Sequence, residues 1–372
     1  MSIKIKEVLT NSDRKKFVNL QYELYKGQKN WVPPLKNGEL HYLQPEHNPA
    51  FKYNDIKFYL AEKDGKVVGR IGAAISPAYN EKTGKKYVRI VKPEFIDDAE
   101  VVDALFKTVE DFGREKGMEL CHGPLGFSNL DTQGLLIEGF DELQSIASVY
   151  HLPYYKEHFE RLGYVKENDW VEFRLKLEEG VIKKGMRATE LIKKRYGFET
   201  IHFTSVAEMK DKAPLVFKIL NEAFAVLPYV VELNEEMQKY YIAKYFDVLN
   251  PKFVKAVKKG DEIVGFIIAV PSLSLAMQKA NGHLFPFGFR HIMKARKQNN
   301  VADLFLTGVA KKNQNEGVAV ILFGEMQKAI WDNGIREFET TGVFEENKEV
   351  INNWKNYEHR QHKRRRCYVK SL

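Results

Sequence analysis

The hydrophobic and polar positions of the first half of the chain follow two periods, which predict strands and helices. Apolar residues that alternate with polar ones, or that form short runs, indicate strands, whereas apolar residues three or four positions apart indicate amphipathic helices. The predicted strands are residues 3–8, 56–62, 67–75, 87–91, 118–122 and 171–177. The predicted helices are residues 11–25, 97–116 and 154–162, the first with N-cap candidates at Asn11, Ser12 and Asp13.

Two of these elements have clear boundaries. Asp64 and Gly65 separate two strand-like runs, as expected for the turn of a β-hairpin. Asp98 favours the start of the helix 97–116 and Gly117 favours its end. The apolar face of this helix consists of Val101, Leu105, Val109 and Phe112.

The second half repeats this order of elements without visible sequence identity. Its predicted strands are residues 200–204, 253–257, 263–270, 302–309, 337–341 and 366–370, and its predicted helices are residues 213–224, 235–246, 317–333 and 348–357. A basic helix over residues 181–195 connects the halves, and an insertion occupies residues 271–300. The mixture of strands and helices predicts an α/β fold. We expect domains at 1–178 and 199–372, with a connecting helix at 179–198.

Composition is consistent with two globular domains. The chain has 372 residues, of which 44% are hydrophobic. It contains no uncharged apolar window of the roughly 18 residues that a membrane span needs, and its first residues lack the apolar core of a signal peptide. The two cysteines, Cys121 and Cys367, form neither a zinc-binding spacing nor a disulfide framework. We therefore expect a cytoplasmic protein without a metal site.

A net charge of +8 indicates an affinity for polyanions, such as nucleic acid, an anionic membrane or a nucleotide cofactor. The excess of basic residues lies mainly in residues 183–195 and 360–366. Aromatic residues that stack on bases are not interleaved with these charges. We therefore expect no nucleic-acid partner, and solvated helix or strand faces explain most of the charge.

One stretch carries candidate chemistry: TGVAKKNQNEGVAVILFGEM, residues 307–326. A helix start leaves about four backbone N–H groups unpaired and carries roughly half a positive charge. Gly317 lets a ligand approach the backbone, Ala319 keeps the first turn slim, and Gln314 can donate to an anion. Lys311 and Lys312 add positive potential. These features suit a pyrophosphate, although an ordinary solvated turn has a similar composition.

The spacing Q-x-x-G-x-A after a strand resembles the acyl-CoA-binding loop of the GNAT acetyltransferase family. The order of elements in both halves is also that of the GNAT fold. Stretches such as WVPPL, NGHLFPFGFR, GLLIEGFD, PYYKEHFERLGY and VFEENK resemble a little-characterised bacterial family of tandem GNAT-like proteins across nearly the whole chain. The resemblance implies two tandem domains, each with a mixed, mostly antiparallel, twisted sheet flanked by helices.

The resemblance also implies roles for residues of the second half. Backbone groups of the strand would face the pantetheine arm and the thioester, the loop would wrap the pyrophosphate, and an asparagine would meet the pantetheine. A carboxylate would serve as general base and a tyrosine as general acid. The implied cofactor-binding residues are Thr307, Val309, Gln314, Asn315, Glu316, Gly317, Val318, Ala319 and Asn347, and the implied catalytic residues are Glu345 and Tyr357.

The sequence departs from the family pattern in both halves. Many GNAT enzymes have a tyrosine seven residues after the asparagine, where this chain has Trp354; Tyr357 lies one helical turn further on. In the first half, Asp97, Asp98 and Glu100 precede the long helix and would repel a pyrophosphate. We therefore expect no CoA site in the first half. Its irregular segment offers Asn129 and Asp131 as polar candidates, or as groups that satisfy their own loop.

The insertion contains an apolar run, Leu284, Phe285, Phe287 and Phe289, near Lys294, Arg296 and Lys297. Packing between domains, an acyl-binding lid and contact with a membrane surface are all compatible with it. The histidines His283, His291, His359 and His362 lack the spacing of a metal site.

The function that these features favour is an acyl-CoA-dependent N-acyltransferase. Its co-substrate would be acetyl-CoA or another acyl-CoA, and its acceptor a small amine or an amino-acid-like molecule. The first alternative is a non-catalytic CoA-binding sensor or scaffold, and the second is a nucleic-acid-binding protein that uses residues 363–366. On this view Gly317→Asp abolishes CoA binding and leaves the fold intact.

Overall fold

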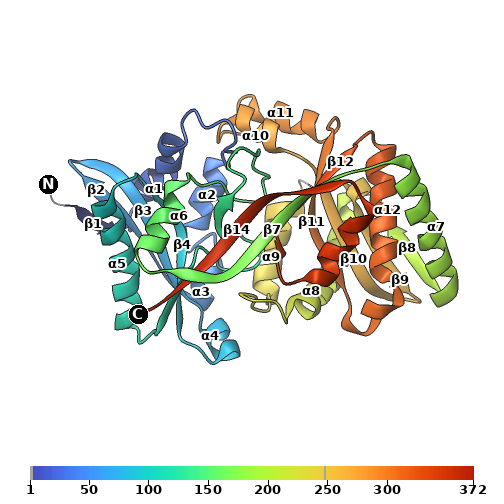
Figure 1. The fold of residues 1–372 in the computed structure, drawn as a ribbon, viewed down its shortest axis with the longest axis horizontal. Helices are drawn as coiled ribbons and strands as arrows, with labels where there is room; N and C mark the ends of the chain where they lie inside the picture. The colour runs from blue at the N-terminus through green and yellow to red at the C-terminus, as the bar shows by residue number, and fades with distance from the viewer. Residues whose placement is uncertain (1–2, 247–248) are drawn as a thin grey trace. The chain divides into compact units, whose positions relative to one another are not determined.

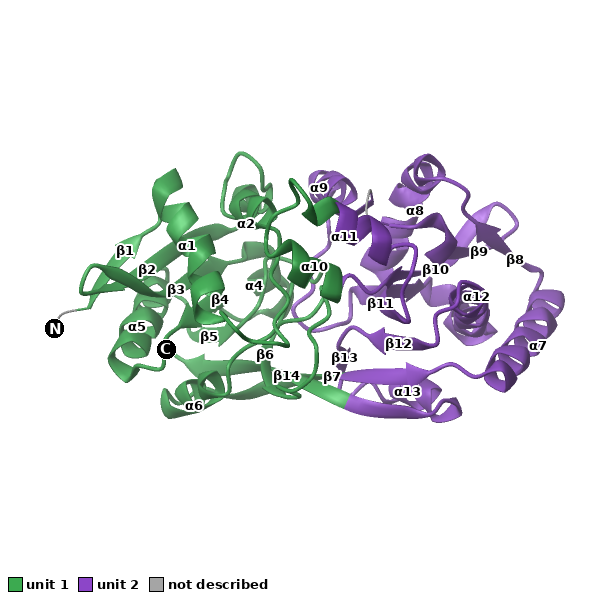
Figure 2. Ribbon diagram, turned by 90° about the horizontal axis from the view of Figure 1, so that it is seen from above, with its two compact units in different colours: residues 1–171, 274–289, 362–372 green, residues 172–273, 290–361 purple. Residues whose placement is uncertain are grey.

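The computed structural model describes residues 3–246 and 249–372, and the chain forms two compact units (Figure 2). Unit 1 comprises Met1–Val171, Ser274–Phe289 and His362–Leu372, and unit 2 comprises Glu172–Leu273 and Arg290–Gln361. Each unit therefore combines segments that are far apart in the sequence.

Unit 1 contains a twisted sheet with helices on both faces (Figure 1). Its strands are β1 (Lys4–Glu7), β2 (Asp55–Lys63), β3 (Lys66–Ile75), β4 (Tyr87–Phe95), β5 (Leu120–Gly123), β6 (Leu135–Glu138), the first part of β7 (Val165–Lys176) and the last part of β14 (His359–Ser371). Its helices are α1 (Asn11–Leu24), α2 (Lys36–Tyr42), α3 (Ala50–Tyr53), α4 (Pro77–Thr83), α5 (Ala99–Glu115), α6 (Tyr154–Arg161) and α10 (Ser274–Ala280).

The strand order in unit 1 is β1-β2-β3-β4-β5-β14-β7. β4 and β5 pair in parallel, whereas the β1–β2, β2–β3, β3–β4 and β5–β14 pairs are antiparallel. The apolar face of α5 packs on this sheet, and Val101, Leu105 and Val109 are fully buried there. Burial of these aliphatic side chains contributes roughly 1.5–3 kcal/mol each to folding.

Unit 2 has the same architecture. Its strands are the last part of β7, β8 (Phe198–His202), β9 (Val254–Lys259), β10 (Glu262–Pro271), β11 (Val301–Val309), β12 (Glu337–Thr340), β13 (Val343–Phe344) and the first part of β14. Its helices are α7 (Glu179–Tyr196), α8 (Val206–Phe224), α9 (Glu235–Tyr245), most of α11 (Gly288–Ala295), α12 (Val318–Asp332) and α13 (Lys348–Asn352), with 3₁₀ turns η2 (Pro251–Phe253), η3 (Lys311–Glu316) and η4 (Asn353–Asn356).

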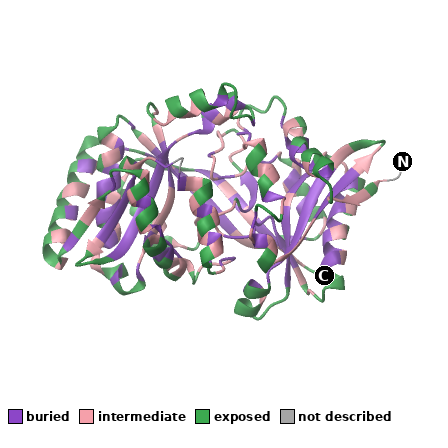
Figure 3. Cartoon of the chain, turned by 180° about the vertical axis from the view of Figure 1, so that it is seen from behind, coloured by how far each residue is buried: buried purple, intermediate pink, exposed green. Residues whose placement is uncertain are grey.

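The strand order in unit 2 is β7-β12-β11-β10-β9-β8, with β11 and β12 parallel. α8 lies on one face of the sheet, and α12 and α7 lie on the other (Figure 2). β10 is buried along nearly its whole length, as expected for a strand covered on both faces (Figure 3). A Cβ on Gly324 of α12 would come within 2.2 Å of Thr189 Oγ1, so this glycine allows α7 and α12 to approach closely.

The final strands are exchanged between the two halves of the sequence. The end of β14 belongs to unit 1, where Tyr368–Ser371 pair with β5, and the end of β7 belongs to unit 2, where it pairs with β12. The boundaries of the two compact units therefore differ from the boundaries of the two predicted sequence repeats. The predicted repeat domains, 1–178 and 199–372, stay a prediction about the origin of the chain.

The predicted α/β class is confirmed, and the predicted strands and helices follow one another as expected. The elements α2, α3, α4, α10, α11, β6 and β13 were not predicted. Two local predictions need correction. The N-cap of α1 is Thr10, whose hydroxyl accepts from the Asp13 N–H at 3.1 Å while the Asp13 carboxylate accepts from the Thr10 N–H at 3.2 Å. The predicted helix 348–357 is α13 followed by the 3₁₀ turn η4.

The apolar run of the insertion is largely in contact with solvent. Phe285 is 73% exposed and Phe287 is 62% exposed. Among the described residues, no helix has both the length and the apolar content to cross a lipid bilayer.

Candidate functional site

The parallel strands β11 and β12 of unit 2 separate after a short paired region. They pair from Val301↔Glu337 to Leu304↔Thr340, where β12 ends, whereas β11 continues to Val309. The register of β11 against β10 slips by one residue at Phe305, which is the position of a β-bulge. Beyond this bulge, β12 does not reach the edge of β11.

The Thr341 side chain bonds the backbone of β11 at the position where β11 and β12 separate. Its Oγ1 donates to the carbonyl oxygen of Leu304 at 2.9 Å or of Phe305 at 3.1 Å. Thr307 and Val309, further along β11, are half-buried and lie on the edge that β12 leaves. The structure therefore provides an edge of backbone N–H and C=O groups at these positions, which an extended polar ligand can pair with.

β11 leads through η3 to α12, and the predicted helix start at Gly317 is confirmed. Gly317 is the N-cap of α12, and, within residues 3–246 and 249–372, no side-chain cap bonds the first turn of this helix. The N–H groups at a helix start carry a partial positive charge, and the first of them lack an intrahelical acceptor. In α12 these are the groups of Val318 and Ala319, because the Val320 N–H donates to the Gly317 carbonyl oxygen at 3.0 Å. The start of α12 consequently has the geometry of an anion-binding site.

Two carboxylates from other elements, Glu222 of α8 and Glu262 of β10, contact the loop before α12. The Lys311 N–H donates to Glu222 Oε1 at 2.8 Å, and Lys312 Nζ lies 2.6 Å from Glu262 Oε2. Glu316 accepts from Asn313 Nδ2 and from Lys259 Nζ, at 2.5 and 3.2 Å, and these contacts hold its pKa below its usual range. The Lys312 side chain is therefore already paired, so it contributes less positive potential to the loop than predicted.

Gln314 and Asn315 are exposed at the outside of this loop. Gln314 Nε2 lies 3.5 Å from the carbonyl oxygen of Val309, so its amide spans the bend between β11 and η3. Val318 is fully buried against β10, whereas Ala319 is half-buried in the first turn of α12. Gln314 and Asn315 are thus available at the surface, whereas Val318 is part of the core.

Gly317 has a structural role that the sequence analysis missed. Its φ is +80°, in the left-handed region, and a Cβ at this position would lie 2.9 Å from Ile192 Cδ1 of α7. A side chain here would strain the backbone and disturb the packing of α7. The expectation that Gly317→Asp leaves the fold intact stays a prediction, and this contact with Ile192 and the positive φ indicate that the substitution lowers stability.

The candidate catalytic residues follow β12. Asn347 is the N-cap of α13, and its Oδ1 accepts from the Val350 N–H at 3.3 Å. Glu345 is half-buried just before it. The Tyr357 hydroxyl hydrogen-bonds to Gln327 of α12, and burial raises the pKa of this tyrosine. Trp354, at the position where many GNAT enzymes have a tyrosine, is buried against Phe338 and Phe323.

The equivalent helix start in unit 1 is occupied by the protein itself. Asp98 is the N-cap of α5, and its carboxylate accepts from the N–H groups of Glu100 and Val101 at 3.0 and 3.3 Å. Lys63 binds the same carboxylate at 2.6 Å, and this contact lowers the pKa of Asp98. An anion would compete with this internal carboxylate.

The strand edge in unit 1 is also occupied. β4 and β5 pair only from Tyr87↔Leu120 to Arg89↔His122, and β4 continues to Phe95. There the Tyr155 hydroxyl accepts from the Phe95 N–H at 3.1 Å, and the Tyr154 hydroxyl donates to the Phe95 carbonyl oxygen at 2.6 Å. In unit 1, tyrosines of α6 thus bond the backbone groups of β4 that correspond to the unpaired edge of β11 in unit 2.

Two buried carboxylates at the junction of β11 and β12 were missed by the sequence analysis. Asp303 and Glu339 are directly opposite each other in the parallel pairing and are 1% and 3% exposed. Arg174 of β7 binds Glu339 at 2.7 Å. The detectable signal was an acidic residue inside each predicted strand, Asp303 between Ala302 and Leu304 and Glu339 next to Phe338.

A cluster of metal-ligand types occurs in unit 1. The ligand atoms of His122, Glu167 and Cys367 lie within 4.8 Å of one another, although spacing along the chain gave no hint of a site. His122 Nδ1 is 3.2 Å from Glu167, Cys367 Sγ is 3.4 Å from it, and the Tyr87 hydroxyl donates to it at 3.2 Å. These hydrogen bonds account for the cluster as it stands. Burial lowers the pKa of His122 to about 4.

One of the two polar candidates in the irregular segment of unit 1, Asp131, has a structural role. Asp131 Oδ2 accepts from the backbone N–H groups of Phe127 and Ser128, at 3.0 and 3.3 Å. Asp131 therefore hydrogen-bonds the backbone of its own loop, which is the second of the two interpretations that the sequence allowed.

Two relatives of known sequence span nearly the whole chain. Protein YghO of Escherichia coli is 25% identical over 376 residues, which cover 99% of this chain and 95% of the relative. A bacterial ceramide synthase of Caulobacter vibrioides is 25% identical over 381 residues, which cover 98% of this chain and 96% of the relative. No family model matches the chain.

Among solved structures, a tandem GNAT protein from the clavulanic acid biosynthesis pathway has the same architecture. The match covers 100% of this chain and 98% of that protein, with a TM-score of 0.56 and 10% identity. The chain therefore has the tandem GNAT fold that the sequence predicted.

Proposed function

We propose that unit 2 binds an acyl-CoA and transfers its acyl group to an amine. The observation that carries this proposal is the difference between two equivalent helix starts. The Asp98 carboxylate accepts hydrogen bonds from the first turn of α5, whereas Gly317 leaves the first turn of α12 without a side-chain cap. Only the second can accept an external diphosphate.

The binding residues that we propose are those of the loop and of the β11 edge. Backbone N–H groups at Gly317, Val318 and Ala319 would hold the pyrophosphate, with Gln314, Asn315 and Glu316 around it. The edge at Thr307 and Val309 would pair with the two amides of the pantetheine arm, as an added strand pairs with a sheet edge. Asn347 would contact the same arm.

Transfer requires a neutral amine, and an amide N–H that polarises the thioester carbonyl would stabilise the charge that develops on its oxygen. We propose Glu345 as the general base, because it lies between β12 and α13, next to Asn347. Tyr357 is the proposed general acid; for that role its hydroxyl must exchange its contact with Gln327 for one with the leaving thiolate.

The proposed acceptors are amines of several kinds. A small-molecule amine or an amino-acid-like compound fits the reaction. The name of the Caulobacter relative, a ceramide synthase, supports the inclusion of long-chain amines among the acceptors. The acyl group would be acetyl or longer.

A non-catalytic CoA-binding protein is the second candidate. Two observations favour it: buried Trp354 stands where many GNAT enzymes have a tyrosine, and the Tyr357 hydroxyl is engaged by Gln327. Such a protein would bind acyl-CoA as a sensor or scaffold without releasing CoA.

One experiment separates these functions. The full chain is mixed with acetyl-CoA or a long-chain acyl-CoA and a panel of short- and long-chain amines, and free thiol is measured. Amine-dependent CoA release supports the transferase. A rise of the melting temperature with acyl-CoA but no release supports the sensor. Neither a melting-temperature shift nor thiol release would contradict both proposals.

A further inference from the structure

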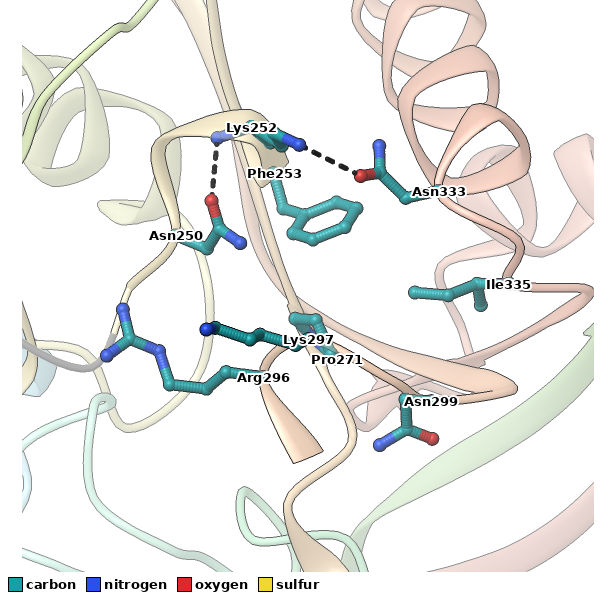
Figure 4. Close-up of a pocket in the computed structure, with 9 residues that line it drawn as sticks. All are labelled: Asn250, Lys252, Phe253, Pro271, Arg296, Lys297, Asn299, Asn333 and Ile335. Atoms are coloured by element: carbon teal, nitrogen blue, oxygen red, sulfur yellow. Dashed lines mark hydrogen bonds between the residues drawn. The ribbon is translucent and has the colours of Figure 1, made fainter. Parts of the chain in front are cut away.

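Unit 2 contains a polar cavity of ≈ 140 Å³ at the end of α12 opposite to Gly317 (Figure 4). α12 has 15 residues, so the cavity lies about 22 Å from the loop at Gly317. The cavity lies where β9 begins and β10 ends, next to the chain that follows α11. Its lining consists of Asn250, Lys252, Phe253, Pro271, Arg296, Lys297, Asn299, Asn333 and Ile335.

The cavity is basic, and none of the described residues that line it is acidic. Three cations, Lys252, Arg296 and Lys297, reach it from two separate segments. Within the described parts of the chain, none of the three forms an ion pair: Lys252 Nζ donates to Asn333 Oδ1 at 3.3 Å, and Arg296 Nη2 donates to the Leu249 carbonyl oxygen at 3.0 Å. Figure 4 shows the side chains of Arg296 and Lys297 extended in the same direction, on the side of Asn250.

The segment that supplies two of these cations is unusual in this chain. Residues 271–302 contain no Asp or Glu, although the chain has 50 acidic residues. Like charges that share a cavity without a counter-ion repel each other, and a bound anion removes this repulsion. The charge pattern therefore favours an anionic ligand.

The size of the cavity and its donors restrict that ligand. Pockets for drug-sized molecules usually have about 300–1,000 Å³, so this cavity accommodates one small charged group. Two ammonium groups, a guanidinium and the Asn250 amide, whose Oδ1 accepts from the Lys252 N–H at 3.1 Å, offer donors from several sides. A group with several anionic oxygens matches this arrangement better than a single carboxylate does.

We propose that this cavity binds a phosphate group, carried by a soluble phosphorylated compound or by a phospholipid headgroup. Phe253 and Ile335 supply apolar walls, and the three cations neutralise the phosphate charge. The site is independent of the acyl-CoA site proposed above, because different residues at the other end of α12 form it.

The test is a calorimetric titration of the full chain with inorganic phosphate. Lys252→Gln with Lys297→Gln removes two cations, both exposed, and Lys294→Gln removes an exposed cation of α11 that does not line the cavity. We expect the double variant to bind phosphate about tenfold more weakly or worse, and Lys294→Gln to bind like the parent chain. Gln314→Glu, in the proposed acyl-CoA loop, should also leave phosphate binding unchanged.

Vesicles identify the source of the phosphate. Co-sedimentation is measured with phosphatidylcholine vesicles that contain phosphatidic acid. Binding that the double variant loses, and that inorganic phosphate competes for, assigns a lipid headgroup; saturable phosphate binding without vesicle binding assigns a soluble ligand. The proposal is overturned if the double variant, with an unchanged melting temperature, binds phosphate and vesicles like the parent chain, or if Gln314→Glu alone removes phosphate binding.

Discussion

Asp98 and Gly317 occupy the same place in the two units: each is the N-cap of the helix that follows a strand with a partly unpaired edge. At Asp98 a carboxylate accepts from the first-turn N–H groups. At Gly317 no side-chain cap is present among the residues that the structure describes. The helix start is therefore capped by a side chain in unit 1 and not in unit 2, and on the proposed function this difference is the reason why we expect the acyl-CoA in unit 2 alone.

Replacement of the internal cap should destabilise unit 1. Asp98→Ala removes two hydrogen bonds to the start of α5 and the contact with Lys63. We expect the free energy of unfolding to fall by about 1 kcal/mol, the usual value of an N-cap. Urea denaturation measures this change. Asp98→Asn, which keeps a capping oxygen, is the matched control, and equal stabilities of the Ala and Asn variants would contradict the assigned role.

Gly317 should tolerate substitution less well than a glycine of similar conformation with free space around it. Gly197, at the end of α7, has φ +71° and no atom within 4 Å of a Cβ, whereas a Cβ on Gly317 meets Ile192 at 2.9 Å. We expect Gly197→Ala to cost about 1 kcal/mol and Gly317→Ala roughly 1 kcal/mol more. Chemical denaturation of both variants tests this.

A double-mutant cycle identifies the cause of the excess. Ile192→Ala removes the side chain that a Cβ on Gly317 would meet. If the contact is responsible, Gly317→Ala should cost no more than Gly197→Ala in the Ile192→Ala background. An excess that persists there would mean that the packing of α7 is not its source.

Buried His151 should make stability depend on pH. Its Nδ1 accepts from the Leu136 N–H at 3.1 Å, and burial lowers its pKa to about 3. The unfolded chain binds a proton near pH 6.5, so the stabilisation by neutral His151 is complete above pH 6.5 and is lost as the pH falls from 6.5 towards 3. For one such group, the free energy of unfolding falls by about 1.4 kcal/mol for each pH unit in this range.

The matched variants are His151→Gln and His283→Gln, the second at an exposed position. Unfolding free energies are measured between pH 4 and pH 7. His151→Gln should flatten the pH dependence, whereas His283→Gln should keep the slope of the parent chain. Parallel slopes for all three chains would refute the assignment to His151.

Glu345 can be tested separately from CoA binding. If it is the general base, Glu345→Gln should lower kcat/KM for the amine by about 10²–10⁴-fold and leave the affinity for acetyl-CoA unchanged. The exposed neighbour Glu346 provides the control Glu346→Gln. Asp303→Asn tests the buried carboxylate at the strand junction. A loss of activity in Asp303→Asn but not in Glu345→Gln would transfer the role of base to Asp303.

The sequence predicted well what depends on local patterns. The hairpin at Asp64 and Gly65, the amphipathic helix α5 and the helix start at Gly317 follow from periodicity and from turn or cap residues, and all three are present. The tandem fold followed from the order of these elements and from family resemblance.

What the sequence did not predict depends on contacts between distant segments. The packing of Ile192 against Gly317, the pairing of Asp303 with Glu339, and the exchange of β7 and β14 each join residues far apart in the chain. The hydroxyl groups of Tyr154 and Tyr155 bond the backbone of Phe95 in the same way. Periodicity within a segment carries no information about such partners.

The most direct test of the central claim is amide hydrogen exchange of the full chain with and without acetyl-CoA. If unit 2 alone holds the cofactor at the start of α12, exchange slows in peptides that cover residues 307–320 and stays unchanged in peptides that cover residues 94–101. No slowing at residues 307–320, or slowing at residues 94–101 instead, would contradict the account.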